Sequence, residues 1–382
     1  MNENDYGLVF AGGGTKGAYQ VGACRAFDEL HLPIRTVLGV SIGALNAALY
    51  AQGDLDLLEE LYRNIEIDDI IGLPSSVDID PEKNLLSPGN AVELAHAKLR
   101  NEIPNNEPLR RLLEKYVDEE KIRKSPIEMG LITYNTEKKA GDELFIDDIP
   151  EGMLIDYLLA SACFPIFAPQ EIDGVAYRDG GYYDNMPVNT LVKRHFKKII
   201  LVDIAGVGRM KKTEDPHVKV KTIRPKEDLG GTFDFDRSNI DKNIQLGYFD
   251  TLKAFHDLTG RYYYFPVAEY ENLLERFSLD EIDGLEEAGA MYDIERFKKW
   301  KADDFLKQVM AAYQQEEALY QADKKDLHLA SVRNYIRKGT GIAVTVDLLR
   351  HYPALIKDLW IQKAVENYLK AAAGIIACQN EQ

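Results

Sequence analysis

Two glycine-rich turns lie within the first fifty residues, and each one separates a short apolar run from a helical pattern. The first turn covers Gly12 to Gly17 and follows the apolar run 8–11. The second covers Gly39 to Gly43 and precedes a run of small residues at 44–51. A repeated order of strand, tight turn and helix is typical of α/β domains, because a helix must return the chain between neighbouring parallel strands. The sequence therefore predicts an α/β domain with a mostly parallel sheet.

Other short apolar runs predict the remaining strands of this sheet. The expected strands lie at 7–11, 36–40, 129–133, 175–178 and 199–204. The segment 68–90 is rich in Pro, Ser, Gly and Asp, which predicts a long loop of the kind that acts as a lid or a binding loop.

The pattern changes after about residue 270. Phe305, Val309 and Tyr313 recur at four-residue steps, and 361–368 follow the i, i+3, i+4, i+7 spacing of an amphipathic helix. We therefore expect one domain over 1–269 and a helical extension over 270–382. Nothing in the extension has a catalytic pattern.

Charge and cysteine content exclude several classes of protein. Forty-six Lys and Arg against sixty-three Asp and Glu give a net charge of −17, whereas a dedicated nucleic-acid binder needs an extensive basic surface. The three cysteines form no CxxC pair, which predicts neither a disulfide framework nor a metal site. The first ten residues lack the pattern of a secretory signal, and the longest uncharged run, 36–53, is too polar for a membrane span. We expect a protein of the reducing cytoplasm.

The first glycine turn matches GxGxxG, the fingerprint of dinucleotide-binding domains. That fingerprint also requires a carboxylate about 20 residues further on, at the end of the second strand. The second expected strand ends at Gly39-Val40-Ser41, without a carboxylate there. The turn is not a P-loop either, because no Gly-Lys-Ser/Thr sequence closes it. A tight turn without a ligand is the open alternative.

The second glycine turn, from Gly39 to Gly43, is a GxSxG sequence between a strand and a helix. A nucleophilic serine needs such a sharp turn to expose its hydroxyl, and the flanking glycines leave room for the strained backbone. A Ser–His–Asp triad is not expected, because none of the seven histidines follows a strand in a glycine-rich loop. They are His31, His96, His195, His217, His256, His328 and His351.

An aspartate offers another base for Ser41. Asp179 follows the expected strand 175–178 and precedes Gly180 and Gly181. A plain turn aspartate is the open alternative for such a pattern. Together, Ser41, Asp179 and a glycine loop supply the nucleophile, the base and the oxyanion donors that acyl transfer requires.

With these motifs the chain resembles the patatin-like phospholipases, which are lipid acyl hydrolases that use a Ser–Asp dyad. Four motifs occur in the family's order over about half of the chain. They are the glycine loop Gly12–Gly17 with Lys16 at its basic position, the serine turn Gly39–Gly43, the stretch Ala160-Ser161 with Pro165 and Phe167-Ala168, and Asp179-Gly180-Gly181 with the following Asn185-Met186-Pro187-Val188.

The resemblance implies a three-layer α/β/α fold with a mostly parallel sheet, extended by C-terminal helices. It implies hydrolysis of carboxylic esters in phospholipids or other lipids, without a cofactor or a metal ion. The sequence itself has no DxDxDG spacing, so we expect no calcium loop. By the same resemblance Ser41 is the nucleophile and Asp179 the base. The implied oxyanion hole is Gly12, Gly13 and Gly14, with Lys16, Gly17, Gly39, Gly43, Gly180 and Gly181 as supporting residues. A free aspartate, with a pKa of about 3.9, is a weak base at neutral pH, so we expect the site to desolvate Asp179.

Three points stay open on the sequence alone. The same dyad could serve a transacylase or a thioesterase, or the fold could be a lipid-binding module whose hydrolysis is incidental. The segment 193–226 holds eleven Lys or Arg and three Asp or Glu, which indicates either a solvated face or contact with an anionic membrane surface. No pattern indicates the oligomeric state.

Overall fold

The computed structural model describes residues 5–79, 85, 87–100, 102–324 and 327–381. The chain divides into two compact units, Met1–Ala254 and Phe255–Gln382. The sequence indicated a change of character at about residue 270, and the division into compact units falls after Ala254.

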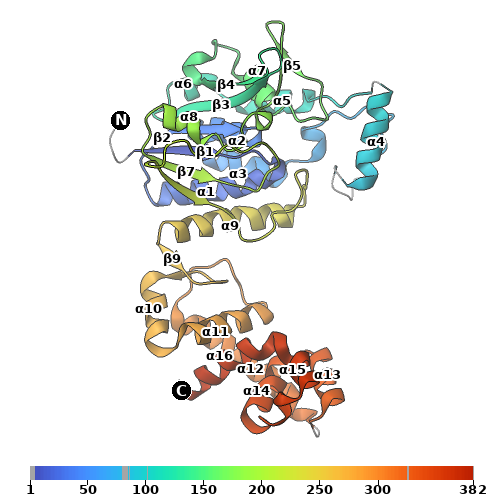
Figure 1. Ribbon diagram of the computed structural model, residues 1–382, viewed down its shortest axis with the longest axis vertical. Helices are drawn as coiled ribbons and strands as arrows, with labels where there is room; N and C mark the ends of the chain where they lie inside the picture. The colour runs from blue at the N-terminus through green and yellow to red at the C-terminus, as the bar shows by residue number, and fades with distance from the viewer. Residues whose placement is uncertain (1–4, 80–84, 86, 101, 325–326, 382) are drawn as a thin grey trace. The chain divides into compact units, whose positions relative to one another are not determined.

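An eight-stranded sheet forms the centre of the first unit (Figure 1). Its strands are β1 (Tyr6–Phe10), β2 (Ile34–Val40), β3 (Glu128–Asn135), β4 (Ala140–Phe145), β5 (Gln170–Ile172), β6 (Val175–Asp179), β7 (Lys198–Val202) and β8 (Lys219–Ile223). The order is β5-β6-β3-β2-β1-β7-β8, with β4 also paired to β3. From β3 to β8 along this order the neighbours are parallel, whereas β4 and β6 run antiparallel to β3 and β5 runs antiparallel to β6. The predicted α/β fold with a mostly parallel sheet is confirmed.

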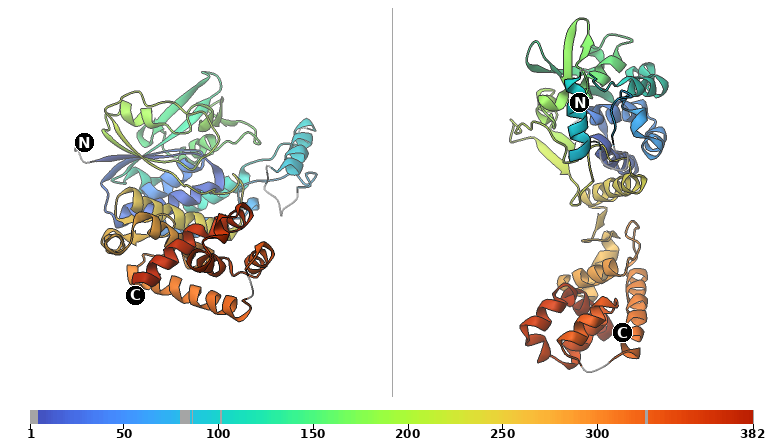
Figure 2. Two further views of the ribbon diagram at one scale, coloured as in Figure 1. Left: turned by 60° about the horizontal axis from the view of Figure 1, so that its bottom comes forward. Right: turned by 90° about the vertical axis from the view of Figure 1, so that its right-hand side faces the viewer.

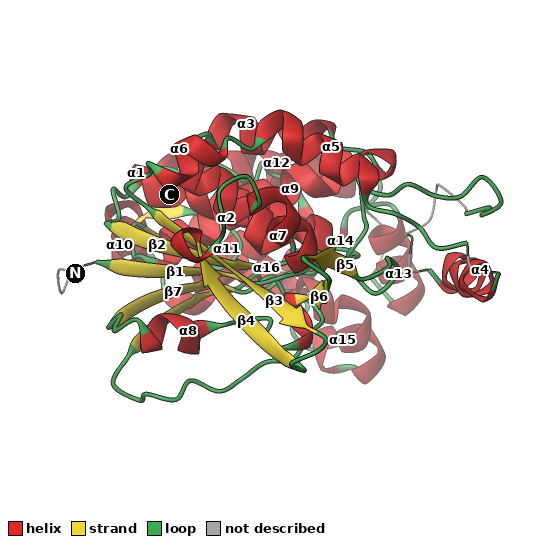
Figure 3. Cartoon of the chain, turned by 90° about the horizontal axis from the view of Figure 1, so that it is seen from above, coloured by secondary structure: helices red, strands yellow, loops and turns green. Residues whose placement is uncertain are grey.

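Helices cover both faces of this sheet. The helices of this unit are α1 (Ala18–Glu29), α2 (Ile42–Gln52), α3 (Leu55–Asn64), α4 (Pro88–Leu99), α5 (Glu107–Tyr116), α6 (Glu119–Arg123), α7 (Leu154–Ser161), α8 (Val188–Lys193) and α9 (Arg237–Ala254), and all but α4 lie against the sheet or its neighbouring helices. Figure 3 shows α1, α2, α3, α7 and α9 on one face and α8 on the other. On the α8 face, Val188 and Leu191 pack against Val9, Leu38 and Ile199 of the central strands.

Helices α1 and α9 approach each other very closely. A Cβ atom on Gly22 would lie 1.8 Å from the Ile244 carbonyl oxygen, and one on Gly247 would lie 1.8 Å from the Tyr19 carbonyl oxygen. Only glycine permits this approach of the two backbones. The first helix of the chain is therefore packed directly against the last helix of its unit.

The segment predicted as a loop at 68–90 contains a short 3₁₀ turn, η2 (Ile67–Asp69), and ends where α4 begins. Residues 80–84 and 86 of this segment lie outside the described residues. Helix α4 stands away from the sheet of its unit in Figure 2, where it is drawn in cyan. Its residues Leu94 and Ala97 are buried in an apolar cluster with Phe167 and Phe233. A lid function for this segment stays a prediction.

The second unit is helical apart from a short hairpin of β9 (Leu258–Thr259) and β10 (Phe265–Pro266). Its helices are α10 (Val267–Arg276), α11 (Leu279–Met291), α12 (Ala302–Ala322), α13 (Leu329–Arg337), α14 (Gly341–His351), α15 (Leu359–Val365) and α16 (Leu369–Glu381). The predicted apolar stripe Phe305, Val309 and Tyr313 is buried on α12 in a core that contains Trp300. Among the helices of the described ranges, none has the length and the apolar content to cross a membrane.

Candidate active site

Ser41 stands between the end of β2 and the start of α2, in a strained backbone conformation. Its φ is 56° and its ψ is −127°, a region that residues with a side chain rarely occupy and that often marks a functional site. A Cβ on Gly39 would lie 2.1 Å from the Gly43 carbonyl oxygen, and one on Gly43 would lie 2.4 Å from the Phe10 carbonyl oxygen. The two flanking glycines therefore make this sharp strand-to-helix turn possible, as the GxSxG pattern predicts.

Ser161, the last residue of α7, hydrogen-bonds to the backbone of the turn that carries Ser41. Its hydroxyl accepts a hydrogen bond from the Ser41 amide at 3.1 Å and donates one to the Ile132 carbonyl of β3 at 2.7 Å. The side chain is fully buried. Ser161 thus fixes the amide of Ser41 to the neighbouring strand. The sequence placed this residue in a motif but gave no indication of its contact.

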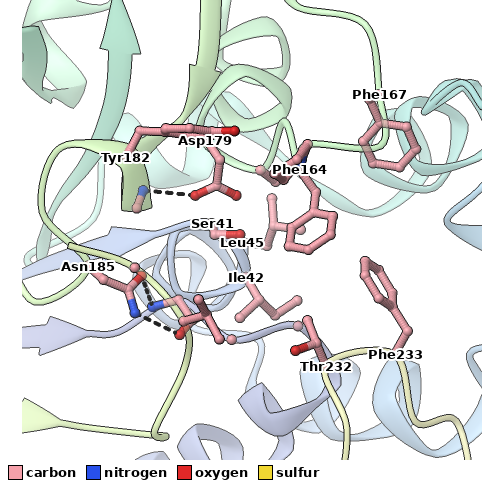
Figure 4. Close-up of a pocket in the computed structure, with 18 of the residues that line it drawn as sticks. Ser41, Ile42, Leu45, Phe164, Phe167, Asp179, Tyr182, Asn185, Thr232 and Phe233 are labelled. Atoms are coloured by element: carbon pink, nitrogen blue, oxygen red, sulfur yellow. Dashed lines mark hydrogen bonds between the residues drawn. The ribbon is translucent and has the colours of Figure 1, made fainter. Parts of the chain in front are cut away.

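Asp179 is the last residue of β6, directly opposite Thr133 of β3. Its carboxylate accepts a hydrogen bond from the Gly181 amide at 2.8 Å, and the Ser41 side chain lies close enough to this carboxylate to lower its pKa. Figure 4 shows this carboxylate directed toward Ser41. Gly180 lies tightly against β3, because a Cβ there would lie 2.2 Å from the Ile132 carbonyl oxygen. The antiparallel strand β6 therefore brings Asp179 next to the carboxyl end of β2, where Ser41 follows.

Burial changes the acid strength of Asp179. Its side chain is 7 % exposed, and desolvation raises the pKa of Asp179 to about 6. The Gly181 amide and the Ser41 side chain act in the opposite direction and lower this pKa. A carboxylate with a pKa near 6 is a stronger base than a free aspartate, yet it is still ionised at neutral pH. The desolvation that the sequence required of this residue is present.

The glycine loop lies on the other side of Ser41. A Cβ on Gly12 would lie 3.1 Å from Cβ of Ser41. Gly14 has a φ of 63°, and a Cβ there would lie 2.0 Å from the Thr232 carbonyl oxygen, so this position requires glycine. Within the described part of the chain the amides of Gly13 and Gly14 have no hydrogen-bond partner. The Gly12 amide, by contrast, donates to Oδ1 of Asn185 at 3.2 Å.

Asn185 connects this loop with the segment that follows Asp179. Besides accepting from the Gly12 amide, its Nδ2 donates to the Gly12 carbonyl at 3.2 Å, and both bonds are drawn in Figure 4. The Asn185 backbone amide donates to the Arg209 carbonyl at 2.6 Å, and the side chain is 2 % exposed. This residue lies in a motif of the sequence, but only the fold shows that its partner is Gly12.

Buried polar side chains of α1 and α2 hydrogen-bond to the backbone at both ends of the glycine loop. Gln20 of α1 donates to the Ala11 carbonyl at 2.7 Å, and Asn46 of α2 donates to the carbonyl of Gly17 at 3.1 Å. Asn46 also donates to Gln20 at 2.8 Å and accepts from the Tyr62 hydroxyl at 3.1 Å. Both ends of the loop are therefore anchored by side chains of the two helices beneath it.

The remaining supporting positions divide into two kinds. A Cβ on Gly17 would lie 2.2 Å from the Tyr62 hydroxyl, so Gly17 is required for packing. The Nζ of Lys16 donates to the Ala205 carbonyl at 3.5 Å. It does not line the cavity that contains Ser41.

Ser41, Asp179 and Gly12–Gly14 line one cavity of about 480 Å³. Most of its other lining side chains are apolar, and the rings of Phe164 and Phe233 form an edge-to-face pair with centroids 5.1 Å apart. Figure 4 shows these two rings facing each other across the pocket. No histidine is found among the described residues that line it, and no group of three or more His, Cys, Asp or Glu in the described ranges could hold a metal ion.

The arrangement of these motifs agrees with one family of known sequences. The model of the patatin-like phospholipase family matches residues 8–192, a range that contains Ser41, Asp179 and the glycine loop. This part of the chain belongs to the patatin-like phospholipase family.

Relatives of the patatin-like unit are known from several organisms. A probable lipid hydrolase of invertebrate iridescent virus 6 is 26% identical over 198 residues, which are 50% of this chain and 64% of that protein. A lysophospholipase of Kluyveromyces lactis is 28% identical over 202 residues, 53% of this chain and 13% of that protein. A lysophospholipase of Aspergillus terreus is 50% identical over 52 residues, 14% of this chain and 3% of that protein. The chain thus spans less than two thirds of each of these relatives.

Two solved structures that match most of this chain share little sequence with it. VipD from Legionella pneumophila is 15% identical, with a TM-score of 0.42 over 98% of this chain and 90% of VipD. The type III effector ExoU is 15% identical, with a TM-score of 0.34 over 97% of this chain and 77% of ExoU.

Proposed function

We propose that the patatin-like unit is a serine acyl hydrolase that cleaves carboxylic ester bonds of phospholipids or related lipids. The observation that carries this proposal is the position of Ser41, in a strained turn, next to the buried carboxylate of Asp179, which points toward it. The amides of Gly13 and Gly14, which have no partner among the described residues, lie on the other side of Ser41 and complete the set of groups that acyl transfer needs. The apolar walls of the cavity favour a lipid ester over a polar one.

The mechanism follows from the positions of these groups. Asp179 takes the hydroxyl proton as Ser41 Oγ attacks the ester carbonyl, and the oxyanion of the tetrahedral intermediate accepts hydrogen bonds from the amides of Gly13 and Gly14. Asp179 then gives its proton to the leaving alcohol, which leaves an acyl group on Ser41. Water then attacks the acyl-enzyme, and Asp179 takes a proton from this water. Asp179 passes the proton to Ser41 Oγ as the carboxylic acid is released. A different acceptor in place of water would make the same site a transacylase.

The rim of the cavity suits contact with a lipid surface. Val207, which lines the cavity, is 94 % exposed and Met210 is 54 % exposed, with Arg209, Lys211 and Lys212 beside them. We therefore place the membrane contact expected for 193–226 at the rim loop, which we define as residues 207–212. Exposed apolar side chains enter the interface, and the basic ones are attracted to anionic lipid.

Other basic residues of 193–226 are engaged within the protein. Lys193 forms an ion pair with Glu143 at 2.9 Å, and Arg224 forms one with Asp203 at 3.4 Å. Arg194 likewise pairs with Glu128. These pairs reduce the charge that the flanks of the segment can offer to a membrane.

A fluorophosphonate probe and an ester assay test the proposed function. The full chain, Ser41→Ala and Asp179→Asn are each treated with the probe and then assayed on nitrophenyl butyrate and on phospholipid vesicles. We expect labelling and turnover in the wild type, neither in Ser41→Ala, and a loss of most turnover in Asp179→Asn with the fold retained. Equal labelling of wild type and Ser41→Ala, or near wild-type turnover in Asp179→Asn, contradicts the proposed dyad.

A further inference from the structure

A second cavity of about 100 Å³ adjoins the one that contains Ser41. We call it the distal cavity. The two cavities have six lining residues in common, so they share a wall. These residues are Gly14, Ile42, Leu45, Ile70, Leu109 and Phe233. The distal cavity continues beyond this wall between α2, α3 and α5, where the catalytic groups do not reach.

One face of α2 leads from the nucleophile into the distal cavity. Ile42, Leu45 and Leu49 lie three and then four residues apart, and all three line it, so they share one face of the helix. Ser41 stands at the N-terminus of this helix. With a rise of about 1.5 Å per residue, the face extends roughly 12 Å from Ser41 to Leu49. Figure 4 shows Ile42 and Leu45 between Ser41 and Phe233.

The lining of the distal cavity is chemically uniform. Beyond the shared wall it is formed mainly by Leu58, Leu61, Leu112 and Leu113, and none of its described lining residues carries a charge. Three of its four polar side chains are already hydrogen-bonded. Asn46 and Tyr62 bond to each other, and Thr15 donates to the carbonyls of Gly231 and Thr232 at 3.2 Å. The fourth is Tyr116, whose ring lies under Lys115 Nζ. Such a space is suited to an alkyl chain, because most of its wall is apolar and most of its polar groups are already bonded.

We propose that the distal cavity binds the far methylene groups of the substrate's acyl chain. The chain would extend from the carbonyl at Ser41 along α2 and pass between the shared side chains Ile42, Leu45 and Phe233. This inference rests on the proposed function for the identity of the chain, and it goes further by making the residues of α3 and α5 the determinants of acyl length.

The test fills the distal cavity from two helices. Leu61→Phe on α3 and Leu112→Phe on α5 alter side chains that are only half buried, so at least one variant is expected to fold. The matched control is Leu319→Phe on α12 in the second unit, where Leu319 is 67 % exposed. Each protein is assayed on nitrophenyl butyrate and nitrophenyl decanoate, and circular dichroism verifies the fold.

We expect the decanoate-to-butyrate ratio of kcat/KM to fall about tenfold in Leu61→Phe and Leu112→Phe, the value of roughly two buried methylene groups. The ratio in Leu319→Phe should equal that of the wild type. A folded cavity variant that keeps the wild-type ratio overturns the inference.

A binding measurement separates this inference from the proposed function. Sodium decanoate is titrated by calorimetry into Ser41→Ala, alone and combined with Leu61→Phe or with Leu319→Phe. Weaker binding by about tenfold with Leu61→Phe alone supports the distal cavity, even if the wild type hydrolyses no ester and the proposed function fails. Absent binding, or equal binding in all three proteins, overturns it.

Discussion

The side chain of Asn185 makes two hydrogen bonds to Gly12, one to its amide and one to its carbonyl, each at 3.2 Å. The two residues belong to different motifs and meet only in the fold. Because Asn185 follows closely after Asp179 in sequence, this pair of bonds ties the segment that carries the base to the loop that offers amides to the oxyanion. It fixes the distance between two groups that act on the same ester under the proposed function.

Loss of this tie should affect turnover more than substrate binding. In Asn185→Ala we expect kcat to fall by about 10²-fold, because a misplaced oxyanion donor costs about as much as a missing one. KM should stay close to the wild-type value, since the apolar walls remain. Steady-state kinetics on nitrophenyl butyrate measure both.

Asn189→Ala is the matched control for Asn185→Ala. Asn189 is also buried and bonds to the carbonyl of Lys212 at 2.8 Å, but it does not line the cavity. We expect its kcat to be that of the wild type. A kcat for Asn185→Ala within twofold of this control would rule out a positioning role.

The raised pKa of Asp179 predicts the pH dependence of the reaction. Asp179 must be ionised to take the Ser41 proton, and its pKa is about 6. The kcat/KM on nitrophenyl butyrate should therefore rise as pH increases through about 6 and level off above it. A profile measured from pH 4.5 to 8 that stays flat would show that another group, or none, acts as the base.

The same shift predicts that the base destabilises the fold at neutral pH. Asp179 has an ordinary pKa of 3.8 and a folded pKa of about 6, so the folded state binds the extra proton between these values. Stability is then fully present below pH 3.8 and is lost as pH rises toward 6. We expect Asp179→Asn to be more stable than the wild type at pH 8, by about 3 kcal/mol, and most of this difference to be lost near pH 4. Thermal melts at both pH values test this, and a wild type that is the more stable protein at pH 8 is the contrary result.

The backbone strain at Ser41 can be measured apart from catalysis. Ser41→Gly and Ser41→Ala both remove the nucleophile, but only glycine adopts a φ of 56° with a ψ of −127° at little cost. We expect the glycine variant to be more stable by about 1 kcal/mol, since relief of strain outweighs the entropy of glycine in the unfolded chain. Melting temperatures compare the pair directly, and an alanine variant of equal or higher stability would mean that the turn is relaxed.

The rim loop predicts binding to anionic vesicles. Val207→Asp combined with Met210→Asp places two charges on side chains that would enter the interface, so binding to phosphatidylserine vesicles should fall at least tenfold. Added salt should weaken the wild-type binding through Arg209, Lys211 and Lys212. Co-sedimentation measures both effects, with Leu279→Asp, also an exposed leucine, as the control. Binding that is insensitive to salt would exclude the basic residues.

Sequence patterns predicted the centre of the sheet better than its edges. Strands β1, β2 and β7 are buried on both faces and appear as continuous apolar runs, so they are easily recognised. Strand β8, with the sequence KVKTI, lies at an edge, and its lysines belong to what the sequence indicated as a basic segment. Strand β5 is only three residues long and β4 is mostly half buried. Short or half-exposed strands carry too little apolar pattern to be recognised.

In the candidate active site, too, local turns were predictable from the sequence, whereas contacts between distant segments were not. Ser41 and the glycine loop were recognisable because glycine spacing records the backbone geometry that each turn needs. The sequence did not predict the hydrogen bonds of Asn185 and Ser161. An asparagine or a serine in a motif does not reveal which distant carbonyl or amide it will bond to. The distal cavity was equally hidden, because it forms only where α2, α3 and α5 come together.

The close crossing of α1 and α9 at Gly22 and Gly247 bears on how the chain is made. During synthesis the glycine loop, the Ser41 turn and α1 leave the ribosome early, while α9 is the last helix of the unit to emerge. Until then the face of α1 that α9 covers stays open to water, and a partly folded chain with such a face is prone to aggregate. A nascent chain can therefore present both Ser41 and Asp179 while this face of α1 is still uncovered, and its first compact unit can close only when residue 254 is free of the ribosome.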